Sequence, residues 1–198
     1  MGTRRLFFAL WPGADFIARL REAADPLGLA GSRAVADPDL HVTLCFLGAV
    51  GESSLPGLCE RAAALQLPRF ELEFEAIEYW SRSRVLAATS ATAPAGAAAL
   101  ARALHAQARD LGLRTDERPL RAHLTLSRGL AADSAPAALP LPLSPPLRLA
   151  ASNFYLAQSQ QLEATSAGSL APCRYARIAA WPLRMRDPDG RRDEAHLQ

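Results

Sequence analysis

The tetrapeptide pattern His-x-Thr-Leu occurs twice in this chain of 198 residues, at 41–44 and at 123–126. Each copy lies in an apolar segment that predicts a β-strand, at about 40–47 and 120–127. In a strand, residues two apart point to the same face and lie about 6.5 to 7 Å apart. Each copy therefore presents an imidazole and a hydroxyl side by side, and the repetition predicts two related lobes.

Helix and strand patterns mix along the chain without a regular alternation. Apolar spacing predicts helices at 15–25, 55–65 and 94–111, and further strands at 4–10, 70–76, 85–89, 147–158 and 175–181. Segment 70–76 alternates glutamate with apolar residues, which is typical of a strand with one wet face. We expect an α+β fold of two antiparallel-sheet lobes with outer helices around a central cleft, related by a pseudo-two-fold axis. The Pro-rich segment 136–146 is predicted to be a connector without strand or helix.

The length and the hydrophobic fraction of 49% fit one domain with a sizeable core. We expect a single bilobal domain over 1–183 and a charged, partly disordered tail at 184–198. The three widely spaced cysteines, Cys45, Cys59 and Cys173, favour neither a disulfide framework nor a zinc site. A reducing, cytoplasmic compartment is expected, and no apolar run is long enough to span a membrane.

The formal net charge is only +2, and all the basic residues are arginines. Such a small charge excludes the broad basic field that binds long nucleic acids tightly and without sequence preference, whereas small anionic ligands remain possible. Four arginines are candidates to add positive charge near the cleft, although a solvated surface position is favoured for each of them: Arg82, Arg84, Arg118 and Arg121. No glycine-rich phosphate loop occurs.

The two repeated segments suit acid–base chemistry. An imidazole has an ordinary pKa of about 6.5, so His41 and His123 can supply one protonated and one neutral group at the same pH. The hydroxyls of Thr43 and Thr125 can donate to phosphate oxygens. A strained cyclic phosphate needs no metal ion for in-line displacement, and the other histidines have no ligand spacing, so neither a metal nor a cofactor is expected.

The motif segments and the start of the chain resemble a known family. The segments HVTLCFLG and HLTLSRG, with RRLFFALWP near the start, are similar to bacterial RNA 2',3'-cyclic phosphodiesterases. These enzymes were first named 2'-5' RNA ligases and belong to the two-histidine phosphoesterase superfamily. The resemblance implies hydrolysis of a terminal 2',3'-cyclic phosphate on RNA ends to a 2'-phosphate, with ATP-independent 2'-5' ligation as the reverse reaction. We also expect the protein to be a monomer.

The resemblance also implies roles for individual residues. It makes His41 the proton donor to the leaving 3' oxygen and His123 the base that activates water. Thr43 and Thr125 would hold the phosphate. The remaining substrate contacts would be Phe46 near the nucleotide and Arg128 near the phosphate.

Strict strand alternation places Arg128 on the face opposite His123, so a bend after Ser127 has to be assumed. The same alternation places Cys45 on the face of His41. Two other functions remain open. One is a related enzyme that acts on small cyclic nucleotides or on 2'-5' linkages, and the other is a non-catalytic module that binds RNA ends.

Overall fold

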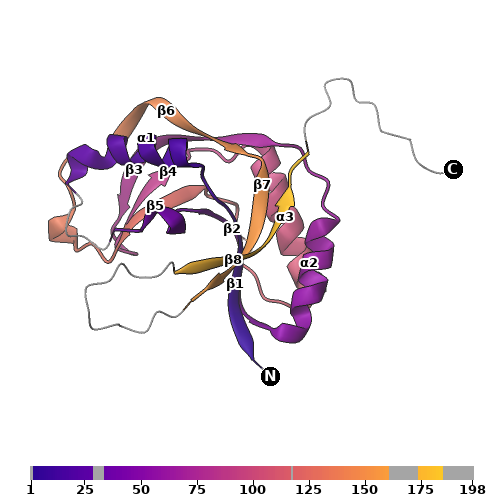
Figure 1. Cartoon of the computed structure of the whole chain (residues 1–198). Helices are drawn as coiled ribbons and strands as arrows, with labels where there is room; N and C mark the ends of the chain where they lie inside the picture. Colours follow the sequence, from indigo (N-terminus) through magenta and orange to yellow (C-terminus); the bar gives the residue numbers. More distant parts are fainter. Residues whose placement is uncertain (1, 29–33, 117, 161–173, 185–198) are drawn as a thin grey trace, which may run out of the picture.

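The computed structural model describes residues 2–28, 34–116, 118–160 and 174–184 (Figure 1). Within these residues eight strands form one sheet, in which every neighbouring pair is antiparallel and the order is β6-β3-β4-β5-β2-β1-β7-β8. The strands are β1 (Thr3–Leu10), β2 (Val42–Gly51), β3 (Phe70–Trp80), β4 (Val85–Thr89), β5 (His123–Arg128), β6 (Leu141–Ala151), β7 (Asn153–Ser159) and β8 (Tyr175–Pro182). The predicted α+β class is confirmed.

Three α-helices lie in the described ranges: α1 (Ala14–Ala24), α2 (Leu55–Ala63) and α3 (Ala95–Asp110). Short 3-10 turns occupy Asp25–Leu27, Asp37–Asp39, Glu52–Ser54 and Ala132–Ser134. Each α-helix buries one apolar stripe, such as Phe16, Leu20 and Ala24 on α1, which are spaced four residues apart. No helix among the described residues is long and apolar enough to cross a membrane.

The sheet has two halves that meet between β5 and β2, where Val42 lies opposite Leu124. One half is β6-β3-β4-β5 and the other is β2-β1-β7-β8. Each half carries one His-x-Thr-Leu segment on its inner strand. Helix α1 follows β1 in the chain but packs against β6, which belongs to the other half of the sheet (Figure 1). Helix α3 lies between β4 and β5 in the chain but packs against β2, again in the other half.

The two faces of the sheet differ in what covers them. On β1, Leu6, Phe8 and Leu10 belong to the large core that includes the buried residues of the helices. Their neighbours Phe7 and Ala9 point to the opposite face, where they form a small separate cluster. The helices therefore pack on one face of the sheet, and the other face is left for the polar residues of the repeated segments.

The largest departure from the sequence prediction is β6. Its proline-rich stretch was expected to be a connector, yet the strand runs through Pro142, Pro145 and Pro146. Among the described strands β6 lies at the sheet edge and pairs with β3 alone, so the missing N–H groups of proline cost little there. The predicted strand 147–158 is divided at Ser152 between β6 and β7. The predicted tail lies outside the described residues except for Arg184.

The helix-covered core should dominate the stability of the fold. Phe74 is fully buried and its ring meets that of Phe16 edge-on at 5.6 Å. We expect Phe74→Ala to lower the free energy of unfolding by about 3–5 kcal/mol, because the truncation leaves a cavity. The matched control is Phe46→Ala, since Phe46 is 41% exposed, and it should cost less than about 1 kcal/mol. Urea unfolding followed by circular dichroism measures both, and similar losses would contradict the assignment of the core.

Candidate active site

The two motif histidines lie at the junction of the sheet halves. His41 directly precedes β2, and His123 is the first residue of β5. With Val42 opposite Leu124 in an antiparallel pair, the register brings His41 next to Thr125 and Thr43 next to His123. The four polar residues predicted from the sequence therefore come together on the face of the sheet that the helices leave uncovered.

Both imidazoles are held by the same kind of hydrogen bond. The Nδ1 atom of His41 lies 2.7 Å from the carbonyl oxygen of Asp39, and Nδ1 of His123 lies 2.8 Å from the carbonyl oxygen of Arg121. Because a carbonyl oxygen can only accept, each Nδ1 must carry the hydrogen. The Nε2 atom of each ring is then the one that exchanges protons with a ligand.

Aromatic rings surround His41. Its ring centroid lies 5.0 Å from that of Phe7, 5.2 Å from that of Trp11 and 4.7 Å from that of Tyr175. Burial among these groups lowers the pKa of His41 from 6.5 to about 4, because the charged form loses its hydration. The positive charge of Arg128 and the neighbouring His123 act in the same direction, while the hydrogen bond to Asp39 opposes them.

The surroundings of His123 are less enclosed and contain more charge. The Trp80 ring lies 4.8 Å from the imidazole, and the Arg121 guanidinium lies 4.5 Å from the centre of the Trp80 ring. Burial is again the largest cause that lowers the pKa of His123, followed among the lowering causes by the positive charges of Arg128 and Arg121. Both histidines are thus shifted toward the neutral form in the free protein.

A one-residue bulge interrupts the alternation of each motif strand. In β5, Ser127 pairs with Leu86 and Thr125 pairs with Ala87, so Leu126 is the extra residue. This bulge turns Arg128 to the face of His123, where its charge acts on both histidines. The bend that was assumed after Ser127 is therefore present one step earlier in the chain, between Thr125 and Ser127.

The corresponding bulge in β2 corrects the prediction for Cys45. Phe8 pairs with Cys45 and Ala9 with Thr43, which leaves Leu44 as the extra residue. Cys45 consequently points into the helix-covered core, with its Sγ 3.5 Å from Nδ1 of His105 on α3. Burial raises the pKa of the Cys45 thiol to about 12, as expected for an unreactive core cysteine.

Phe46 and Arg128 occupy equivalent places, because each follows its motif histidine by five residues and each comes after the bulge. Phe46 pairs with Phe7, which places both rings on the face of the histidines. The Arg5 guanidinium lies 4.9 Å from the centre of the Phe46 ring. This face therefore offers an exposed aromatic ring beyond one histidine and a cation beyond the other.

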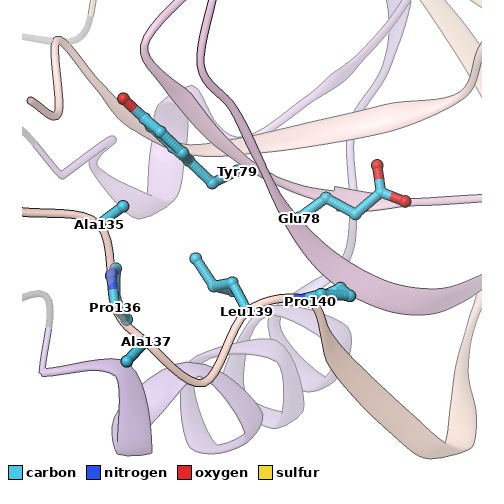
Figure 2. Close-up of a pocket in the computed structure, with 7 residues that line it drawn as sticks. All are labelled: Glu78, Tyr79, Ala135, Pro136, Ala137, Leu139 and Pro140. Atoms are coloured by element: carbon cyan, nitrogen blue, oxygen red, sulfur yellow. The ribbon is translucent and has the colours of Figure 1, made fainter. Parts of the chain in front are cut away.

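Two hollows lie apart from the histidines. One, of about 510 Å³, lies between β3 and the segment 135–140; Figure 2 shows Glu78 pointing away from Leu139 and Tyr79 pointing to the opposite side. The other, of about 790 Å³, lies along α3. Of the described residues, neither His41 nor His123 lines either hollow. The site is thus defined by its side chains and not by the hollows.

The sequence is similar to a known protein family and to two named relatives. The sequence model of the family described as LigT-like phosphoesterase matches residues 11–87. The chain is 35% identical to an RNA 2',3'-cyclic phosphodiesterase of Escherichia coli (strain K12) over 130 residues, which are 63% of this chain and 72% of the relative. It therefore belongs to the LigT-like phosphoesterase family. An RNA 2',3'-cyclic phosphodiesterase of Archaeoglobus fulgidus is 30% identical over 131 residues, with the same coverage of both chains.

A solved LigT-like phosphoesterase has the same architecture. The crystal structure of E. coli LigT complexed with 3'-AMP superposes with a TM-score of 0.76 at 28% identity, covering 91% of this chain and 98% of that chain. The superposition extends over nearly all of both proteins, so the two sheet halves are shared as well as the motif strands. The activity of this chain is accordingly that of a phosphoesterase.

Several residues near the histidines were not found from the sequence. Phe7, Trp11 and Tyr175 surround His41 but come from distant segments, and no local pattern links them. Asp39 could have been noticed, since it precedes His41 by two residues just as Arg121, one of the four arginines named from the sequence, precedes His123. Among the described residues no group of three or more His, Cys, Asp or Glu is placed to hold a metal ion. Cys173 and His196 lie outside the described residues.

The position of Arg128 predicts a measurable electrostatic effect. Its positive charge disfavours the imidazolium forms of both His41 and His123. Removing the charge by Arg128→Gln should therefore raise the pKa of both histidines. Titration of the imidazole resonances by NMR measures the shift, with Arg4→Gln as the control because Arg4 pairs with Glu52 at 3.1 Å. Unchanged histidine titrations in Arg128→Gln would show that the guanidinium does not face the site.

Proposed function

We propose that this phosphoesterase hydrolyses the 2',3'-cyclic phosphate at RNA ends to a 2'-phosphate, with His41 as acid and His123 as base and without a metal ion. One observation carries the proposal. Two imidazoles from equivalent strands lie on one face, and each donates Nδ1–H to a backbone carbonyl, so that Nε2 is the atom available to substrate. Two such groups on either side of a phosphorus atom suit in-line displacement.

In the proposed step, one histidine accepts a proton and the other donates one. Neutral Nε2 of His123 accepts a proton from water while the water oxygen attacks phosphorus. The bond between phosphorus and the 3' oxygen breaks, and imidazolium Nε2–H of His41 donates its proton to that oxygen. The products are a 3'-hydroxyl and a 2'-phosphate. With the 5'-hydroxyl of a second RNA in place of water, the same displacement would join the two RNAs through a 2'-5' linkage and release the 3'-hydroxyl.

The negative charge of the phosphate is important for this scheme. Burial lowers the pKa of His41 to about 4 in the free protein, so the imidazolium needs a nearby negative charge at neutral pH. A bound phosphodiester supplies that charge. Arg128, which acts on both histidines, and the hydroxyls of Thr43 and Thr125 are proposed to hold the non-bridging oxygens.

A nucleotide substrate is supported by the relatives. E. coli LigT has been solved in complex with 3'-AMP, with ATP and with NADP+. In this chain the exposed ring of Phe46, with Arg5 over it, is the proposed contact for the nucleoside. We further propose one catalytic domain over 1–183 that acts as a monomer on RNA ends in the cytoplasm, where the free thiols of Cys45 and Cys59 would persist.

The decisive experiment is product analysis on an oligonucleotide that ends in a 2',3'-cyclic phosphate. With EDTA present we expect complete conversion to the 2'-phosphate. We expect His41→Ala and His123→Ala each to reduce turnover by at least about 10²- to 10⁴-fold, as is usual when a general acid or base is removed. The double variant should be little worse than either single variant, because both groups act in one transition state.

The matched control is His105→Ala, since His105 lies on α3 against Cys45 and so belongs to the opposite face of β2. This variant should keep its activity. Loss of activity in EDTA that a divalent ion restores would overturn the metal-independent scheme, and near-normal turnover by either motif variant would overturn the two-histidine assignment. Faster turnover of a mononucleotide 2',3'-cyclic phosphate, or of 2'-5' linkages, would favour the alternative substrates.

The threonines separate catalysis from binding. If their hydroxyls donate to oxygens whose charge increases in the transition state, Thr43→Val and Thr125→Val should each lower kcat by about 10- to 10³-fold with a smaller change in KM. Valine keeps the branched shape that suits the strand. Steady-state kinetics on a cyclic-phosphate dinucleotide tests this, with circular dichroism to verify folding. A module that only binds RNA ends would instead show weaker affinity, and an unchanged kcat would remove the threonines from the mechanism.

A further inference from the structure

The two motif copies share their geometry but differ in charge at one equivalent position. The residue two positions before each histidine supplies the carbonyl that accepts Nδ1–H, at 2.7 Å from His41 and 2.8 Å from His123. That residue is Asp39 in the first copy and Arg121 in the second. The two residues that anchor the imidazoles, Asp39 and Arg121, thus carry side chains of opposite charge.

Asp39 is built into the surroundings of His41. The residue is only 5% exposed, and its carboxylate accepts the backbone N–H groups of Arg174 at 3.0 Å and Tyr175 at 3.2 Å. The Tyr175 ring in turn lies edge-on to His41 at 4.7 Å. One residue therefore fixes both the acceptor of Nδ1–H and the ring that covers the imidazole. Its negative charge favours the imidazolium form of His41.

Arg121 has the corresponding place beside His123, with the opposite effect. Its guanidinium donates to Oε2 of Glu78 at 2.8 Å, and Oε2 also accepts Nε1–H of Trp80 at 2.9 Å. Because Trp80 contacts His123, the side chain of Arg121 is tied to the imidazole through this ring. The positive charge of Arg121 favours the neutral form of His123.

We propose that Asp39 and Arg121 are positioning residues that bias the two histidines toward different roles, Asp39 favouring the proton-donating His41 and Arg121 the proton-accepting His123. This inference rests on the proposed function. Acid–base catalysis requires one protonated and one neutral imidazole, whereas the two motif strands are related by a pseudo-two-fold axis. The opposite charges of Asp39 and Arg121 are one source of that difference.

The other charged groups around the two rings do not create this difference. Burial and the charge of Arg128 on β5 lower the pKa of both histidines, and a charge on His123 would lower that of His41 further. On β8, Tyr175 meets His41 with its ring, and Arg177 lies over Trp11 and Tyr155. On β3, Glu78 is already bonded to Arg121. The side chain of Asp39 raises the pKa of His41, whereas that of Arg121 lowers the pKa of His123.

The test is an NMR titration of both imidazoles in the full chain, with and without saturating inorganic phosphate. Asp39→Asn should lower the pKa of His41 by about 0.5 or more and leave that of His123 in place. Arg121→Gln should raise the pKa of His123 and leave that of His41 in place. Arg121→Lys is the matched control, because it keeps the charge and should keep the wild-type titration of His123.

Kinetics on the cyclic-phosphate oligonucleotide should show a kcat about 10-fold lower in Asp39→Asn, with KM changed less. Equal shifts of both histidines in either variant would overturn the inference, as would identical His123 titrations in Arg121→Gln and Arg121→Lys. If Asp39→Asn does not fold, the two Arg121 variants decide alone. The titrations need no turnover, so an inactive wild-type protein would overturn the proposed function and not this result.

Discussion

Side chains of an uninterrupted β-strand alternate between two faces. In each motif strand the histidine, the threonine and one later residue share a face, and strict alternation cannot place all three together. The histidine and the threonine are two residues apart and satisfy it, whereas Phe46 and Arg128 follow their histidines by five and do not. One extra leucine in each strand, Leu44 or Leu126, resolves the conflict.

The rest of the site depends on these two bulges. They turn the residue just before Phe46 or Arg128, which is Cys45 or Ser127, away from the histidines. They also put an apolar ring at one end of the shared face and a cation at the other, although the two strands are copies of one pattern. A ligand with a flat base and an anionic phosphate matches that pair of ends.

The sequence allowed the motif residues and most elements to be predicted because both are local features. The His-x-Thr-Leu segments could be assigned to strands from their own apolar pattern, and α3 from its alanine and leucine spacing. The bulges could not be predicted in this way, since an extra residue is defined only against a partner strand. The strand through Pro142 was missed for a similar reason, because proline is tolerated there only at a sheet edge, and edges follow from topology.

The rings around His41 also could not be predicted from local sequence, and their contact with His41 makes the stability of the fold depend on pH. Phe7 comes from β1 and Tyr175 from β8, and they meet at His41 only in the folded chain. In the unfolded chain that histidine would bind a proton near pH 6.5, whereas in the folded protein its pKa is about 4. Between these values the unfolded form holds more protons, so the free energy of unfolding decreases as the pH is lowered.

For one such histidine the free energy of unfolding decreases by about 1.4 kcal/mol for each pH unit between these values, or by roughly 3 kcal/mol at pH 4. Above pH 6.5 this histidine does not reduce the free energy of unfolding. Enclosing an imidazole for proton transfer thus makes the folded protein sensitive to acid. A bound phosphate favours the imidazolium form and would offset part of this loss. Occupancy of the site and resistance to acid unfolding are therefore coupled through the same ring.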